Sequence, residues 1–264
     1  MNGCIELRCG DCLDIMDELP DGSVDMVLCD LPYGNTRNSW DVQLDLDALW
    51  KQYRRIVKPN GAIVLFGSGR FTAALMQSNT RDWRYNLVWE KTSPTGFLNA
   101  KKMPLRAHED ILVFYHKPPT YNPIMTDGKR KVSTAQHKRN SKGGSSYGLY
   151  KPITYDSDKR YPRSVLHFQT DKQKCALHPT QKPVALLEYL ICMYSNEGDL
   201  ILDNCMGSGS TGVAALQSRR KFFGIETDQD MFKIAKNRLD QEVDHLGLQD
   251  IHQPAKGPED PLLQ

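Results

Sequence analysis

The stretch "DLPYG", residues 30–34, places an acid, a proline and an aromatic ring at the end of the apolar run "VDMVLCD". Proline has a fixed backbone and no N–H, so the carbonyl groups around it remain available as acceptors. Asp30 and the Pro32 carbonyl could together accept both N–H groups of one amino group, with the Tyr33 ring stacked on the heterocycle that carries it. The motif predicts a site for an aromatic base with an exocyclic amine. On its own it fits a strand-end cap and a turn aromatic equally well.

A second candidate site lies in "DLILDNCMGSGSTGVAALQSRRKFFGIETD", where an expected strand ends at Asp203 and a glycine loop follows. Gly207, Gly209 and Gly212 precede an expected helix, and the next strand ends at Glu226. Strand, glycine loop, helix, strand and acid form the layout of a nucleotide-binding unit. The glycines let the backbone approach a ligand, and Glu226 is placed to accept hydrogen bonds from ribose hydroxyls.

Two ligand classes fit such a loop. A nicotinamide dinucleotide would place its pyrophosphate at the helix N-terminus, whereas S-adenosylmethionine has an amino acid end and no phosphate. Asp203 would repel a pyrophosphate but could pair with an ammonium group. The sequence therefore favours S-adenosylmethionine, with a nicotinamide-dependent oxidoreductase as a more distant alternative.

Short apolar runs alternate with helical patterns along most of the chain, which is typical of a parallel sheet with helices on both faces. Too few residues follow the glycine loop to build the rest of such a sheet, so the remaining strands must come from the N-terminal part, and we expect a circularly permuted fold. The expected strands are 5–9, 24–30, 62–67, 85–90, 110–116, 199–203 and 221–226, and the expected helices are 46–57, 182–195 and 210–220.

Several motifs together resemble one family, the amino-methyltransferases that modify adenine N6 or cytosine N4 in DNA. "DLPYG" is similar to the family's D/N/S-P-P-Y/F/W motif, "LDNCMGSGSTG" to its S-adenosylmethionine loop and "GIETD" to its acidic strand end. "GDCLDIM" and "HPTQKPVALLEYLI" resemble further motifs, and their order is that of the permuted β-type group. The resemblance implies a Rossmann-like α/β methyltransferase fold with S-adenosylmethionine as cofactor. The candidate cofactor-binding residues are Asp11, Asp30, His178, Thr180, Lys182, Asp203, Gly207, Gly209, Thr211 and Glu226.

The chain departs from the family pattern at two places. Leu31 stands where the family usually has proline, and Asn204 and Cys205 follow Asp203 where the family has "D-P-F" or "D-P-C". Pro32 is retained, so we expect the acceptor geometry to survive and Leu31→Pro to leave activity largely intact. Asn204 weakens the correspondence at the cofactor loop.

The resemblance implies a mechanism in which Asp30, Pro32 and Tyr33 are the catalytic residues. Hydrogen bonds from the N6 amino group to Asp30 and to the Pro32 carbonyl would direct the nitrogen lone pair at the sulfonium methyl. A carboxylate is too weak a base to deprotonate neutral adenine, so Asp30 orients the amine and accepts a proton late, if at all. The base must first leave the duplex stack, and stacking on Tyr33 would return about 1–3 kcal/mol.

Asp in the motif favours adenine N6 in double-stranded DNA, since the family's cytosine-N4 enzymes more often carry serine there. Cytosine N4 remains the nearest alternative. A catalytically silent DNA-binding module that keeps the fold is another.

Residues 118–163 interrupt the alternation with a polar, basic segment that contains tyrosines and is rich in Gly, Ser and Pro. One reading is a disordered loop; the other is an inserted target-recognition lobe whose cations bind phosphates. The predicted division is a catalytic half at 1–117, this lobe, a cofactor half at 164–243 and a flexible tail at 244–264. The candidate DNA-binding residues are Lys129, Arg130, Lys131, Lys138, Arg139 and Lys142.

The amino-acid composition limits the classes of protein to which the chain could belong. With 39% hydrophobic and 25% charged residues over 264 positions the chain resembles an ordinary globular protein, and no stretch is as long and apolar as a membrane span. The seven cysteines fit reduced thiols, and Cys9 and Cys12 are expected to pack rather than to bind a metal. We expect a cytoplasmic protein of a bacterial or phage-infected cell, without a metal, with double-stranded DNA as partner, and with a homodimer and a restriction endonuclease as further candidate partners.

Overall fold

The computed structural model describes residues 4–34, 44–133, 154–169 and 181–248. Two compact units are distinguished: Pro123–Arg163, and the remainder of the chain. Within the described residues, no helix is long and apolar enough to cross a membrane.

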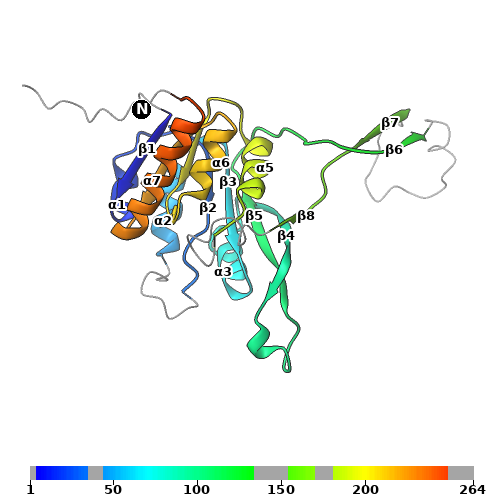
Figure 1. The fold of residues 1–264 in the computed structure, drawn as a ribbon, viewed down its shortest axis with the longest axis horizontal. Helices are drawn as coiled ribbons and strands as arrows, with labels where there is room; N and C mark the ends of the chain where they lie inside the picture. The colour runs from blue at the N-terminus through cyan, green and yellow to red at the C-terminus, as the bar shows by residue number, and fades with distance from the viewer. Residues whose placement is uncertain (1–3, 35–43, 134–153, 170–180, 249–264) are drawn as a thin grey trace, which may run out of the picture. The chain divides into compact units, whose positions relative to one another are not determined.

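The larger unit is built on an eight-stranded sheet of the order β1-β10-β9-β2-β3-β5-β4-β8 (Figure 1). Only β5 runs antiparallel to its neighbours β3 and β4, and the other pairs are parallel. The predicted mostly parallel sheet is therefore confirmed. The strands are β1 (Ile5–Cys9), β2 (Val24–Cys29), β3 (Val57–Gly67), β4 (Trp83–Thr95), β5 (Arg106–Phe114), β8 (Val165–Phe168), β9 (Leu200–Asp203) and β10 (Lys221–Glu226).

Circular permutation is visible in the strand order. β9 and β10 are encoded last, yet they lie between β1 and β2 and pair with both. Cys9 at the end of β1 is in register with Glu226 at the end of β10. The C-terminal part of the chain thus supplies central strands to a sheet that the N-terminal part begins.

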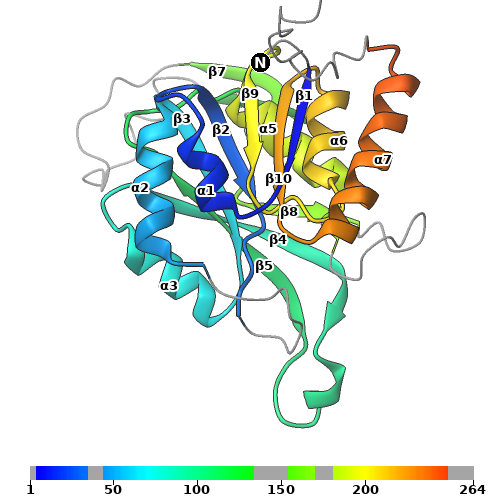
Figure 2. The same ribbon diagram turned by 90° about the vertical axis from the view of Figure 1, so that its left-hand side faces the viewer.

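Helices cover the two faces of the sheet as two groups (Figure 2). One group holds α1 (Cys12–Asp17), α2 (Leu46–Ile56) and α3 (Arg70–Ser78), and the other holds α5 (Val184–Tyr194), α6 (Ser210–Gln217) and α7 (Gln229–His245). In β2, Val27 and Cys29 join the hydrophobic cluster with the first group, whereas the buried Met26 and Leu28 do not belong to it. Because successive side chains of a strand point to opposite faces, a strand covered on both sides is apolar throughout.

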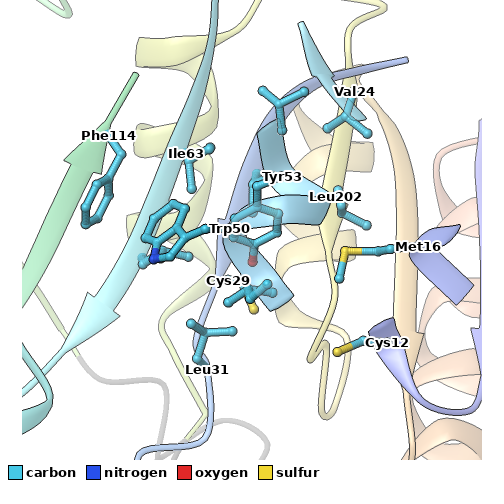
Figure 3. Close-up of a cluster of buried hydrophobic side chains, with 14 of the residues drawn as sticks. Cys12, Met16, Val24, Cys29, Leu31, Trp50, Tyr53, Ile63, Phe114 and Leu202 are labelled. Carbon is cyan, nitrogen blue, oxygen red and sulfur yellow. The ribbon is translucent and has the colours of Figure 1, made fainter. Parts of the chain in front are cut away.

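The helix α2 illustrates how the sequence forms the first layer. Asp45 caps its N-terminus by accepting hydrogen bonds from two backbone N–H groups of the first turn. Leu49, Trp50, Tyr53 and Ile56 recur at helical spacing and are all buried. Figure 3 shows Trp50 and Tyr53 within the hydrophobic cluster. This stripe fixes the face that α2 presents to β2 and β3.

The smaller unit contains a two-stranded antiparallel sheet of β6 (Thr126–Ser133) and β7 (Tyr155–Arg160). Lys129, Arg130 and Lys131 lie on β6 and are exposed. Arg130 donates two hydrogen bonds to Asp156 of β7, at 2.8 and 2.7 Å. Lys138, Arg139 and Lys142 lie outside the described residues, and the target-recognition role of the segment stays a prediction.

Leu31, the residue that departs from the family motif, belongs to the hydrophobic cluster of the first layer and is only 2% exposed (Figure 3). This burial changes the expectation for Leu31→Pro. Leucine truncations at buried sites cost about 2–5 kcal/mol, and proline retains only part of the side-chain volume. We expect Leu31→Pro to lower the free energy of unfolding by about 2 kcal/mol, measured by urea denaturation, while methyl transfer per folded molecule persists.

The matched control is Leu98→Pro, because Leu98 is 85% exposed; its unfolding free energy should change by less than about 1 kcal/mol. An unchanged stability for Leu31→Pro would contradict the structural role of Leu31.

Candidate active site

The carboxyl ends of β2, β9 and β10 bring the two sequence motifs to one edge of the sheet. Asp30 follows the last residue of β2, and Asp203 is the last residue of the adjacent, parallel β9. Glu226 ends β10, the next strand along. Open α/β sheets bind ligands at this edge. The structure therefore unites residues that lie far apart in the chain.

The carboxylate of Asp30 is held by two donors. The Tyr33 hydroxyl donates to Oδ1 at 3.0 Å, and the Lys182 ammonium group donates to Oδ2. The Asp30 side chain remains 31% exposed, while that of Lys182 is 10% exposed. The Asp30 carboxylate is thus partly exposed, while the Lys182 side chain that holds it is largely buried.

Lys182 belongs to a buried cluster of alternating charges. Its Nζ lies 3.2 Å from Glu109 Oε2, and the other oxygen of Glu109 pairs with Lys91. Lys182 also lies over the Phe66 ring, 4.9 Å from the centroid. Glu109 and Lys91 come from β5 and β4, so two strands beyond β3 contribute to the support of Asp30.

Neighbouring charges keep Lys182 and Glu109 ionised. Burial is the largest effect on Lys182 and disfavours its charge, but Asp30 and Glu109 outweigh burial and raise the pKa of the ammonium group. Burial likewise opposes ionisation of Glu109, yet Lys182 and Lys91 lower the pKa of its carboxyl group. Each charge therefore depends on its neighbours, and the loss of one would leave another buried and unpaired.

An aromatic pair stands beside Asp30. The Tyr33 ring stacks on Phe71 of α3, with centroids 4.7 Å apart and an angle of 25° between the planes. Burial, followed by the charge of Asp30, raises the pKa of the Tyr33 hydroxyl well above its usual value, so the hydroxyl stays a donor. Phe71 occupies one face of Tyr33, so stacking on a base would have to use the other face; that role stays a prediction.

The three glycines of the predicted cofactor loop differ in backbone conformation and in the space around them. Gly207 has φ of +51°, and a Cβ placed on it would meet open space. Gly209, with φ of +77°, precedes the first residue of α6. A Cβ on Gly212 would come within 2.7 Å of Leu239 and Phe222, so this glycine lets α6 pack closely. Gly207 is therefore the position at which a ligand can approach the backbone.

Two predicted acidic residues are engaged with the backbone around the loop. Glu226 accepts hydrogen bonds from the N–H groups of Gly207 and Asp228, both at 2.9 Å. Asp11 is exposed and caps α1 by accepting from the Leu13 N–H at 2.7 Å. A carboxylate oxygen has lone pairs for more than one donor, so both side chains can also receive ligand hydroxyl groups.

Asp203 is buried beneath the loop, where its Oδ1 accepts from the Cys205 N–H at 3.1 Å. Burial raises its pKa to about 6, although the Thr211 hydroxyl and the Cys29 thiol hydrogen-bond to it and act in the opposite direction. A buried carboxylate with a raised pKa gains from an arriving cation. The buried Asp203 carboxylate, the open backbone at Gly207 and the Glu226 carboxylate together fit a ligand with an ammonium group and ribose hydroxyls. They fit a ligand with a pyrophosphate less well, because both carboxylates would repel it.

Asn204, the second departure from the family motif, is buried and has partners of its own. Its Oδ1 accepts from the Tyr53 hydroxyl at 2.6 Å. Its Nδ2 lies 3.6 Å from Cys12 Sγ and 3.5 Å from Cys205 Sγ. The loop after β9 is thereby tied to α2 and α1.

The structure places most of the predicted residues at the same edge, but His178 and Thr180 lie outside the described residues. Within the described residues no group of His, Cys, Asp and Glu side chains could hold a metal ion. Sequence reasoning missed Lys91, Glu109 and Phe71. The available signal for Glu109 was its place in the strand segment "HEDILVF", two residues before the apolar run begins.

The hydrogen bond between Tyr53 and Asn204 generates a stability prediction. Tyr53→Phe leaves a buried amide oxygen without its donor, which costs about 1–3 kcal/mol. We expect urea denaturation to show this loss for Tyr53→Phe. Adding Asn204→Ala to that variant should lower the unfolding free energy by less than Asn204→Ala does in the wild type, because both partners of the hydrogen bond are then gone. Tyr121→Phe, at a residue 49% exposed, is the control. Strict additivity of the two changes would contradict the coupling.

Comparison with known proteins agrees with this geometry. Residues 24–237 match the N6/N4 family described as "DNA methylase". The chain is 28% identical to the Type II methyltransferase M2.LlaDCHI of Lactococcus lactis subsp. cremoris, over 88% of this chain and 87% of that protein. It is also 28% identical to the DNA adenine methyltransferase YhdJ of Escherichia coli, over 88% and 81%.

Solved structures show the same fold. The crystal structure of the M1.HpyAVI complex with S-adenosylmethionine is 25% identical with a TM-score of 0.63, covering 89% of this chain and 99% of that one. The cytosine-N4-specific PvuII DNA methyltransferase has a TM-score of 0.65 at 15% identity, covering 92% and 91%. The fold is thus that of the S-adenosylmethionine-dependent methyltransferases, and the match over residues 24–237 shows that this chain belongs to the N6/N4 family of DNA methylases.

Proposed function

We propose that this DNA methyltransferase transfers a methyl group from S-adenosylmethionine to the N6 amino group of adenine in double-stranded DNA. The observation that carries the proposal is the Asp30 carboxylate. It stands partly exposed beside the cofactor loop, with Tyr33 and Lys182 each holding one of its oxygens.

S-adenosylmethionine, when bound, supplies a methyl group on a positively charged sulfur. Three residues would hold it: Gly207 would offer open backbone, Glu226 would accept from ribose hydroxyls and Asp203 would pair with the ammonium group. Asp11 lies at the start of α1, where the family places an acid near the cofactor adenine. His178, Thr180 and Thr211 complete the proposed set.

Asp30 acts on the target base as an orienting acceptor. Hydrogen bonds from the amino N–H groups to Asp30 and to the Pro32 carbonyl would localise the nitrogen lone pair and aim it at the methyl group. Both oxygens of Asp30 already accept from fixed donors, so the carboxylate cannot turn away and has lone pairs left for one more N–H. This arrangement suits positioning of the amine better than removal of its proton.

Lys182 has a positioning role within this mechanism. Its contacts are with Asp30 and Glu109, and through them the charge cluster sets where the acceptor stands. The cofactor contact predicted for Lys182 from the sequence stays a prediction.

Adenine is preferred over cytosine because the motif begins with Asp30 rather than with serine. Similarity to the adenine enzyme of Escherichia coli supports this choice, whereas likeness to the cytosine-N4 enzyme is a likeness of fold. Base flipping from the duplex, DNA binding by the basic segment 118–163, a homodimer and a restriction endonuclease partner belong to the same proposal. The name Type II methyltransferase is carried by relatives of this chain.

The product of the reaction tests the proposal. Phage DNA is incubated with the protein and methyl-labelled cofactor, digested to nucleosides and separated. We expect the label in N6-methyl-2′-deoxyadenosine, and label in N4-methyl-2′-deoxycytidine would overturn the adenine assignment. Asp30→Ala should lower the transfer rate by at least about 100-fold while S-adenosylhomocysteine still raises the melting temperature.

The matched control is Asp244→Ala, because Asp244 is exposed near the end of α7. It should keep the full rate. An Asp30→Ala variant with normal transfer would remove Asp30 from the mechanism.

The raised pKa of Asp203 predicts a pH dependence. The folded state holds a proton that the unfolded chain releases near its ordinary pKa of 3.8, so stability falls as pH rises from about 4 through about 6. Asp203→Asn removes the buried charge, and we expect a gain of roughly 2 kcal/mol in unfolding free energy at neutral pH and a flatter profile over that window.

The same substitution that raises stability should lower the affinity for the cofactor. Because Asp203 is proposed to pair with an ammonium group, Asp203→Asn should weaken S-adenosylhomocysteine binding by at least tenfold, measured by calorimetry. The wild-type affinity should fall below pH 6. Equal affinities in both proteins would contradict the proposed contact, and equal pH profiles of stability would contradict the buried charge.

A further inference from the structure

The hairpin between β4 and β5 extends beyond the edge at which the active site lies. β3 ends at Gly67, which pairs with Asp110 of β5, and β8 pairs with β4 only as far as Lys91. Past these pairs, among the residues that the structure describes, the two strands of the hairpin pair only with each other, up to the pair of Thr95 with Arg106. Figure 2 shows the hairpin projecting from the sheet, with the short helix η1 (Phe97–Asn99) at its end.

The tip of this hairpin is apolar and exposed. Phe97 is 76% exposed and Leu98 is 85% exposed, and Met103 and Leu105 are also exposed. Single exposed apolar side chains are common on proteins, but four of them on one turn form a patch, and such patches mark interaction sites.

Basic residues surround the apolar tip. Lys101 and Lys102 lie between the two pairs of apolar residues, and Arg106 lies where the strands resume. Residues 92–107 contain no Asp or Glu. All charged residues of this segment are therefore basic, and they surround an apolar tip. A nucleic acid matches both features, because its phosphates are anionic and its stacked bases have apolar faces.

The base of the hairpin is joined to the catalytic carboxylate. Lys91 at the end of the β8 pairing and Glu109 near the start of β5 belong to the charge cluster that holds Lys182 and Asp30. The hairpin therefore rises from the same edge that a flipped base must approach. A base that leaves the duplex vacates a space in the stack, and proteins fill or open such spaces with apolar side chains.

We propose that the hairpin of residues 92–107 binds duplex DNA, with Phe97 and Leu98 inserted at the base stack and Lys101 and Lys102 on phosphates. This inference rests on the proposed function and deepens it by naming the surface that engages the duplex. It assigns a DNA contact outside the basic segment 118–163.

The lysine contacts are tested by salt dependence of binding, which needs neither activity nor the recognition sequence. The full-length protein is titrated with a mixed-sequence duplex at several salt concentrations. Each phosphate contact contributes about 0.9 to the slope of log K against log salt, so Lys101→Ala/Lys102→Ala should lower the slope by about 2. An unchanged slope and affinity would overturn the phosphate contacts. Absence of DNA binding by the wild type would instead contradict the proposed function.

The apolar contacts are tested with Phe97→Ser/Leu98→Ser. We expect at least a tenfold lower methyl transfer rate on duplex DNA, with the melting temperature and its increase by S-adenosylhomocysteine unchanged, because both side chains are exposed. Leu246→Ser is the matched control, since Leu246 is also exposed and follows α7, and it should keep the full rate.

Two outcomes would overturn the insertion. One is a duplex transfer rate equal to that of the wild type. The other is sedimentation showing that Phe97→Ser/Leu98→Ser converts a wild-type dimer to a monomer with DNA affinity per subunit unchanged, which would make the tip an interface between copies of this chain.

Discussion

The parallel pairing of β2 with β9 is the constraint on which the active site depends. Met26 and Val27 are in register with Ile201 and Leu202, and this register brings the residues that follow both strands to one edge. A strand slipped by one residue would reverse which side chains face each helix layer, so the side-chain packing on both faces depends on this register. The strand ends that carry Asp30 and the predicted cofactor loop are therefore aligned by the pairing of two buried strands.

Buried charges add precision to that alignment at an energetic cost. Asp30, Lys182, Glu109 and Lys91 alternate in sign, so each desolvated charge has an opposite neighbour. An apolar core of the same volume would often be equally stable or more stable. The gain is positional: an acceptor held from two sides presents its remaining lone pairs in one direction, which is what a weakly nucleophilic amine requires.

The parts of the fold that follow local rules could be predicted from the sequence. All seven expected strands are present, because strands buried on both faces are apolar throughout. The helices α1, α3 and α7 were missed, α7 because its apolar positions lie among many charges, and the strands β6, β7 and β8 were missed as well. Glu109 and Phe71 were missed for a different reason: each matters through a partner that is remote in sequence, and no local pattern encodes such a pair. The exposure of the β4–β5 hairpin tip was equally invisible, since apolar residues there resemble core residues in sequence.

The two departures from the family motif show why single letters are weak guides to geometry. Leu31 replaces a proline, yet its side chain completes the hydrophobic cluster under the catalytic strand end. Asn204 replaces another, and its side-chain oxygen accepts a hydrogen bond from Tyr53 of α2. Proline restrains the backbone by its ring, whereas these residues restrain it by burial and by a hydrogen bond. The same turn can thus be fixed by tertiary contacts, provided that the partners, here α2 and the core, are encoded elsewhere in the same chain.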